Sequence, residues 1–182
     1  MEENGHRPVT YDHLKKAKQP SIKKLWMCLD AEADLAYREA EQDWGVAQLI
    51  YGEEEGEPKD AAKLEEAKHK YETAKQAAVE SSVEFVFQSL GRKKFSALLD
   101  EHAPTTDQLA KAEDDGEGKP DWNIDTFPAA LVAAALVEPQ LTEEEVSEMW
   151  DSDNWSASEL NDLFTTAVQC QNTRRLIEVG ND

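Results

Sequence analysis

The side chains of this 182-residue chain that could do chemistry are four histidines, two cysteines and several acidic runs. No two histidines share a helical face or stand beside a carboxylate at a metal-binding spacing. Cys28 and Cys170 follow no metal or redox spacing, so we expect reduced thiols packed as small apolar groups. The sequence therefore predicts no metal and no cofactor. The histidines are His6, His13, His69 and His102.

The acidic runs 53–55 and 143–145 carry carboxylates that could bind a cation or act as an acid–base pair. A solvated turn explains the first run better, and a helix N-terminus, whose dipole favours acids, explains the second. Residues 91–94, Gly-Arg-Lys-Lys, have the bases of a phosphate-binding loop but lack its glycines. No serine or cysteine lies in a known nucleophile motif. We therefore predict that the protein is not an enzyme.

The charge of the whole chain limits its partners. Asp and Glu number 39 against 19 Lys and Arg, which gives a formal net charge of −20. Such a chain repels the phosphates of nucleic acid, and it favours solubility or a basic partner. The most apolar run, residues 129–137, is short, whereas a membrane span needs about twenty residues. Residues 1–13 lack the apolar core of a signal peptide, so we expect a cytoplasmic protein with no nucleic acid and no membrane partner.

One stretch, residues 82–104, changes its periodicity at a single glycine, and the segments around it must dock on it. Apolar residues alternate at Val83, Phe85 and Phe87, which predicts a strand over 82–90 with one buried face. Beyond Gly91, apolar residues recur with the period of an amphipathic helix. This pattern predicts a helix over 92–101.

A helical hairpin is predicted before this stretch. Apolar residues recur at steps of three and four in segments 31–51 and 59–81, which a turn rich in glycine and glutamate separates. We expect the outer ends of the hairpin to pair as antiparallel strands 22–29 and 82–90. The alternative is one unbroken helix over 21–51, capped by Ser21. The expected seams are Ala36, Ala40, Trp44, Ala47 and Tyr51 in the first helix and Leu64, Ala67, Tyr71, Ala74 and Ala78 in the second.

The second half of the chain carries several signals for helix starts. Asp125 could cap a largely apolar helix that Pro139 ends. The charged, glycine-containing stretch 111–121 precedes this helix and predicts a subdomain boundary there. Three pairs have the spacing of a capping box: Thr105 with Gln108, Thr142 with Glu145, and Ser156 with Glu159.

Together these patterns predict a mostly α (α+β) fold. A long antiparallel helical hairpin is joined to a small two-stranded antiparallel sheet, and a compact carboxy-terminal helical subdomain follows. The predicted domains are a loose amino-terminal arm over 1–20, a strand–hairpin–strand–helix domain over 21–110, a charged linker over 111–121 and an acidic helical subdomain over 122–182.

Charge and aromatic content indicate the acidic subdomain as the binding region. Between Asp121 and Thr173 there are eleven Asp or Glu and no Lys or Arg. An apolar groove rimmed by these acids would suit a basic amphipathic helix. The alternative is that the large apolar side chains are internal and the acids merely solvate the surface. The candidate partner-binding residues are Trp150, Trp155, Leu160 and Phe164.

Three blocks of the chain resemble the tail assembly chaperones of long-tailed phages (siphoviruses) that infect actinobacteria. The first is residues 27–30, Met-Cys-Leu-Asp, which lead into the hairpin. The second is residues 84–105, and the third is residues 122–145 with a later helix that ends in Asn-Thr-Arg-Arg at 172–175. The order of these blocks carries the resemblance, which covers most of residues 22–175.

The resemblance implies a small acidic protein of the host cell cytoplasm that is absent from the mature virion. Members of this family bind the tape measure protein, a long helix-rich chain, keep it soluble and help the tail tube polymerise around it. The implied partners are the tape measure protein and the major tail (tube) protein, with self-association left open. An acidic surface suits this role, because it keeps a complex with an apolar, often basic client in solution.

Two other classes of function remain open on the sequence. A virion structural protein, such as a tail completion or head–tail connector subunit, would also be helical and non-enzymatic, and its presence in purified particles would identify it. A protein mimic of DNA needs acids spaced like phosphates on an exposed face. The acids of this chain cluster at helix caps and turns instead, which argues against such a mimic.

Overall fold

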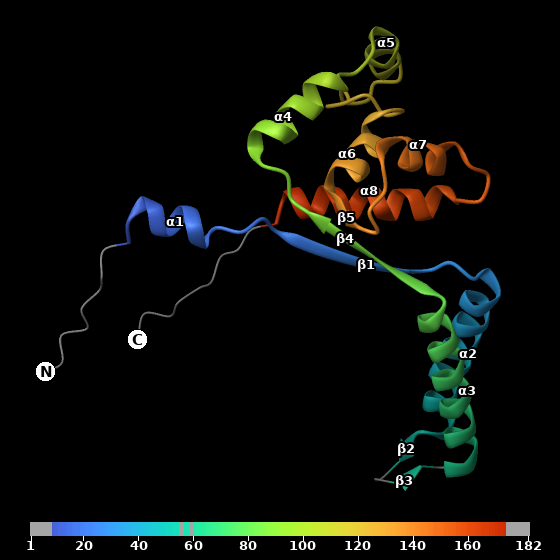
Figure 1. The fold of residues 1–182 in the computed structure, drawn as a ribbon. Helices are drawn as coiled ribbons and strands as arrows, with labels where there is room; N and C mark the ends of the chain where they lie inside the picture. Colours follow the sequence, from blue (N-terminus) through green and yellow to red (C-terminus); the bar gives the residue numbers. More distant parts are fainter. Residues whose placement is uncertain (1–8, 55–56, 59, 174–182) are drawn as a thin grey trace, which may run out of the picture. The chain divides into compact units, whose positions relative to one another are not determined.

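The computed structural model describes residues 9–54, 57–58 and 60–173 (Figure 1). The chain divides into two compact units, Met1–Lys24 with Val86–Asp182, and Leu25–Phe85. We call them the larger unit and the hairpin unit. Among the helices of the described residues, none has the length and apolar character needed to cross a membrane.

The hairpin unit consists mainly of two helices that run side by side, α2 (Ala31–Tyr51) and α3 (Ala61–Glu80) (Figure 1). These helices confirm the predicted hairpin. A side-chain cap starts each one: the Asp30 carboxylate accepts from the N–H groups of Glu32 and Ala33, and the Asp60 carboxylate accepts from the N–H of Lys63. Between the two helices, the short strands β2 (Glu53–Glu54) and β3 (Glu57–Pro58) pair antiparallel.

The seam between α2 and α3 is thin. Ala47 and Ala78 are the buried residues of the two helices, and the rings of Tyr37 and Tyr71 lie 5.9 Å apart. The Tyr37 hydroxyl donates a hydrogen bond to Glu41 Oε1 at 2.9 Å. This bond and, to a smaller extent, the neighbouring Tyr71 raise the pKa of Tyr37 to about 12. Ala36, which we placed in the seam, is exposed. The longer side chain of Tyr37, one position on, reaches the partner helix in its place.

A three-stranded antiparallel sheet has the order β1 (Ile22–Cys28), β4 (Ser82–Gln88) and β5 (Leu136–Glu138). Ser21 and Ser89 are joined at one end of the β1–β4 pair by two hydrogen bonds of 2.8 Å, one from each backbone N–H. The predicted strand pair is therefore confirmed, and the alternative of one helix over 21–51 is wrong.

The third strand corrects one expectation of the sequence. We expected one helix to run to Pro139, but α6 (Phe127–Ala135) ends at Ala135 and the chain continues as β5. Glu138 precedes a proline, a position that disfavours helix, and an open edge of β4 offers backbone partners. Val86 pairs with Glu138 and Phe87 with Leu136, with a register shift between them.

The larger unit holds the remaining helices. These are α1 (Tyr11–Ala17), α4 (Arg92–Glu101), α5 (Thr106–Asp114), α7 (Glu143–Asp151) and α8 (Ala157–Gln171), together with α6. All three predicted capping boxes are present, at the starts of α5, α7 and α8. Asp125 does not cap α6, whose N-cap is Thr126; the Asp125 carboxylate instead accepts from Gln108 Nε2 at 2.9 Å.

The core of the larger unit joins α6 and α8 to the sheet. The buried thiol of Cys170 in α8 donates to the carbonyl oxygens of Ser21 at 3.3 Å and Phe87 at 3.5 Å. The other cysteine, Cys28, is half-buried. The fully buried side chains that fill this core are Phe87, Phe127, Leu131, Val132, Val146 and Leu163.

The predicted domain boundaries remain predictions. The stretch 111–121 and both of its flanks belong to the larger unit, and hydrogen bonds link the two flanks. One of them runs from the N–H of Asn123 to the carbonyl oxygen of His102, at 2.7 Å. Part of the predicted arm, residues 1–8, and the carboxy-terminal residues 174–182 lie outside the described residues.

We predict opposite stability effects for Gly45, inside α2, and Gly52, the C-cap residue of that helix. An added Cβ at Gly45 has nothing within 4 Å, so Gly45→Ala should stabilise the hairpin unit by about 1 kcal/mol through helix propensity. An added Cβ at Gly52 would meet the carbonyl oxygen of Gln48, so Gly52→Ala should destabilise the unit by about 1–3 kcal/mol. Urea unfolding followed by far-ultraviolet circular dichroism measures both changes. Shifts in the same direction would contradict this account of how α2 ends.

Candidate functional site

A cluster of rings around Phe127 organises one surface of the larger unit. Phe127, the first residue of α6, is only 1% exposed. Its ring centroid lies 5.1 Å from that of Trp122, 6.1 Å from Phe164, 6.3 Å from Phe95 and 6.4 Å from His102. These contacts draw together α4, α6, α8 and the segment before α6. Tilted and edge-to-face ring pairs of this kind add about 0.5–1.5 kcal/mol each to the burial of their surface.

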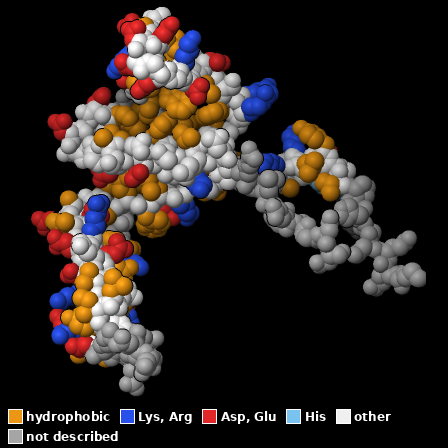
Figure 2. Space-filling model, turned by 180° about the vertical axis from the view of Figure 1, so that it is seen from behind, with side chains coloured by type: hydrophobic (Ala, Val, Ile, Leu, Met, Phe, Trp, Pro, Cys, Tyr) orange, Lys and Arg blue, Asp and Glu red, His pale blue; other side chains and the backbone are white. Residues whose placement is uncertain are grey.

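An apolar groove of about 430 Å³ opens beside this cluster. Trp122 and Phe164 pack their rings 6.0 Å apart and also line the groove, so they join the core to the surface. Ile124, at the rim, is 58% exposed. Apart from Asn161, all the lining side chains are apolar. Figure 2 shows hydrophobic side chains gathered over this unit, with acidic side chains at the edges of the patch.

The structure brings three of the four predicted site residues together at this groove. Trp150 of α7 and Leu160 and Phe164 of α8 line it, and all three are half-buried. Trp155 is also half-buried but lies in the turn between α7 and α8, outside the groove lining. These side chains are therefore not wholly internal, and their role in binding a partner stays a prediction.

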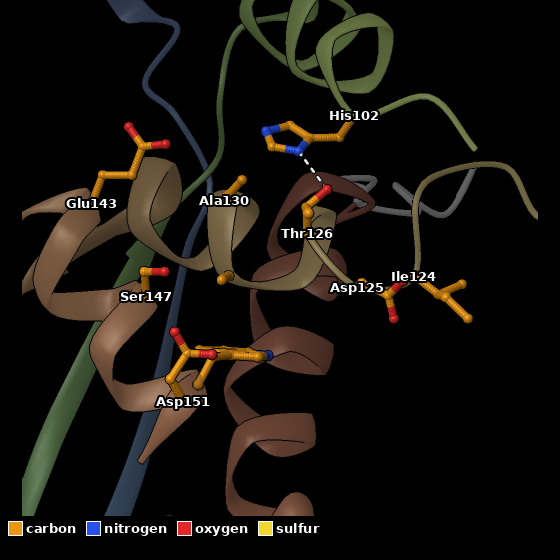
Figure 3. Close-up of a pocket in the computed structure, with 10 residues that line it drawn as sticks. His102, Ile124, Asp125, Thr126, Ala130, Glu143, Ser147 and Asp151 are labelled. Atoms are coloured by element: carbon orange, nitrogen blue, oxygen red, sulfur yellow. Dashed lines mark hydrogen bonds between the residues drawn. The ribbon is translucent and has the colours of Figure 1, made fainter. Parts of the chain in front are cut away.

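An acidic hollow of about 540 Å³ adjoins the groove (Figure 3). Ile124 and Trp150 line both cavities, so the two share a wall. Glu143, Ser147 and Asp151 follow one another at four-residue steps along α7 and face this hollow; Asp125 lies on its other side (Figure 3). No Lys or Arg is among the residues that line the hollow. The surface is thus apolar on one side of Trp150 and anionic on the other.

One glutamine of α5 holds the segment that carries Trp122 and Ile124. The side-chain Nε2 of Gln108 donates to Asn123 Oδ1 at 3.0 Å and to Asp125 Oδ2 at 2.9 Å. Its Oε1 accepts from the backbone N–H of Thr105, within the capping box of α5. Nearby, His102 Nδ1 lies 2.8 Å from Thr126 Oγ1, at the start of α6. These bonds fix the entry to α6, and with it the rim of both cavities.

The chemistry of this surface is suited to binding. Its carboxylates, on Asp125, Glu143 and Asp151, belong to exposed residues in an open hollow. Among the residues that the structure describes, no group of three or more His, Cys, Asp or Glu is placed to hold a metal ion. A positively charged chain with an apolar side would match both cavities at once. That the protein is not an enzyme stays a prediction.

The basic run at residues 91–94 lies at the start of α4. Gly91 is the N-cap of this helix and makes no side-chain capping bond. Lys93 and Lys94 are exposed and line a separate hollow of about 400 Å³, together with Pro20 and Val137. The start of α4 is therefore one of the basic parts of the larger unit, whereas the surface around α7 is acidic.

Sequence reasoning missed the part of the groove that precedes α7. Trp122, Ile124 and Pro128 contribute to its lining, and we assigned them no role in binding. The available signal was the pair Trp122 and Ile124, two large apolar residues directly after a charged linker. A single pair of residues is too short to define a helical or strand period, so nothing in the sequence indicated which side chain would remain at the surface.

We predict that Gln108→Glu destabilises the larger unit by about 1–3 kcal/mol, because two donors are lost and a carboxylate is placed against Asp125. Urea unfolding measures the change. Gln140→Glu is the matched control, since Gln140 is exposed and the substitution changes the charge equally. Equal stabilities of the two variants would show that Gln108 does not hold the segment 122–126.

Comparison with known proteins offers no relative for this arrangement. No family model, curated protein or solved structure matches the chain. The groove and the acidic hollow are therefore interpreted from their own residues.

Proposed function

We propose that this protein is a tail assembly chaperone of a siphovirus of actinobacteria, which binds the tape measure protein and keeps it soluble. The observation that supports the proposal best is the apolar groove that adjoins an acidic hollow across Ile124 and Trp150. Such a surface suits a basic amphipathic helix, whose apolar side would enter the groove and whose bases would face the carboxylates. The three blocks of sequence that resemble this family of chaperones also support it.

The two parts of the surface would contribute differently to the complex. Burial of apolar side chains in the groove gives affinity, at about 25 cal/mol for each Å² removed from water. Exposed carboxylates contribute less to affinity, but they raise the association rate and select against acidic segments. We therefore expect binding that weakens moderately with salt and does not vanish, because the apolar part is not screened.

The net charge of the chain explains how the complex would stay in solution. A tape measure chain exposes many apolar helices before the tube surrounds it, and such helices aggregate. Each bound copy of this protein would add up to 20 negative formal charges, and like charges keep the complexes apart. Release of these copies as the major tail (tube) protein polymerises would leave the chaperone outside the mature virion. A virion structural protein would remain in purified particles, which distinguishes the alternative.

We predict that Ile124→Lys lowers the soluble fraction of the co-expressed tape measure protein. Ile124 is exposed at the wall between the two cavities, so the change places a positive charge at the site without disturbing the core. Binding should weaken at least about tenfold, because the client would no longer bury an isoleucine and its bases would be repelled by the new lysine. The amount of tape measure protein in the soluble fraction is the measurement.

Leu49→Lys is the matched control. Leu49 is 87% exposed on α2, so the variant makes the same kind of change in the hairpin unit. If the client stays fully soluble with Ile124→Lys but not with Leu49→Lys, the client binds the hairpin unit and not the groove. If neither variant has an effect, a basic helix in the groove is not how the client is bound.

A further inference from the structure

The helix α1 is little covered by the rest of the described chain. It has seven residues, and none of them is buried. Val9, Tyr11 and Leu14 are 63%, 78% and 57% exposed, respectively. Isolated helices of this length are marginal in water, because the cost of starting a helix exceeds what one or two turns return. A surface that buries its apolar side would stabilise α1.

The chemistry of α1 complements that of the groove. Val9 and Leu14 hold the positions of a hydrophobic staple around the N-cap Thr10, and Tyr11 lies on the same side as Leu14. Three lysines, at positions 15, 16 and 18, follow at the carboxy-terminal end of the helix, against one acid, Asp12. The segment is thus a short basic amphipathic helix. The groove is apolar, and the adjoining hollow carries Asp125, Glu143 and Asp151 without a Lys or Arg.

We infer that the groove of one copy binds α1 of a second copy of this chain. Within one chain α1 does not occupy this groove: none of its residues is buried, and the residues that line the groove all lie between Trp122 and Phe164. The apolar residues and lysines of α1 are therefore available to the groove of another copy, where the lining is apolar and the adjoining hollow is acidic.

The exchange can be reciprocal. Each copy has one α1 and one groove, so two copies can each give a helix and receive one, which closes a two-fold dimer. In the dimer both grooves are occupied, so self-association and client binding exclude each other. A client with a longer basic helix would displace α1. The helix α1 would therefore cover the groove while no client is bound, and the client could still enter it. Formation of the dimer requires only the groove and α1, so it can be measured without the tape measure protein.

The mass of the full chain in solution tests the inference. In sedimentation equilibrium from about 1 µM to about 1 mM, the average mass should rise from the chain mass of 20.4 kDa towards twice that value. Leu14→Asp should weaken the dimer at least about tenfold, since it removes a leucine that would be buried at each contact. Leu49→Asp, an equal change on α2, should leave the dimer unchanged. Because Leu14 is 57% exposed and no residue of α1 is buried, loss of the dimer with Leu14→Asp would not reflect a defect in the core.

A charge exchange tests the register of the contact. Lys15→Glu with Lys16→Glu should weaken the dimer, and adding Glu143→Lys with Asp151→Lys to the same chain should restore it. A monomer at every concentration overturns the inference, whether α1 is free or lies in its own groove. Association that Leu14→Asp leaves intact, or that Leu49→Asp abolishes, overturns it as well. A dimer that fails to bind the client would refute only the proposed function.

Discussion

The burial of one ring, Phe127, is the constraint on which the binding surface depends. Four rings from three segments surround it, and each ring has two faces and an edge to cover. In a unit of this size the outer members of such a cluster cannot all be enclosed, because little chain remains to cover them. Trp122 and Phe164 use one side to pack on Phe127 and present the other to the groove. The exposed apolar area is therefore a consequence of how the core is built, and its position is as rigid as the core.

The acids of this region have two separate roles. Glu145 and Glu159 close the capping boxes of α7 and α8, so their carboxylates are already engaged by backbone N–H groups. Asp125 is held by Gln108. Glu143 and Asp151 are exposed, and they give the hollow its negative potential. The number of acids in this region therefore overstates the charge available to a basic partner, because only carboxylates that face the hollow can contact it.

The helical framework could be predicted from the sequence because its signals are local. Capping boxes, the seam of α3 and the change of period at Gly91 each depend on residues a few positions apart, and the structure places those elements as expected. The strand β5 could not be predicted, because Leu136 and Val137 continue an apolar run and only the open edge of β4 makes them extended. Trp122 and Ile124 were missed for the same reason: the bonds of Gln108, a distant residue, decide where they lie. Trp155 is close to Trp150 in the sequence, but it lies outside the groove lining, so closeness in sequence did not predict its place.

The two units differ in how their apolar residues are covered, and this difference bears on what each can do. The seam of the hairpin unit buries Ala47 and Ala78 and little else of its helices, whereas Leu35, Leu49 and Ile50 of α2 are exposed. These exposed side chains lie along the convex surface of a helix. A concave site buries more of a partner's surface for each side chain that binding orders. Binding there therefore loses less conformational entropy than binding to a convex helix face. On physical grounds, then, a small helix that needs a surface is accommodated better by the groove of the larger unit than by the hairpin, even though the hairpin exposes apolar side chains of similar size.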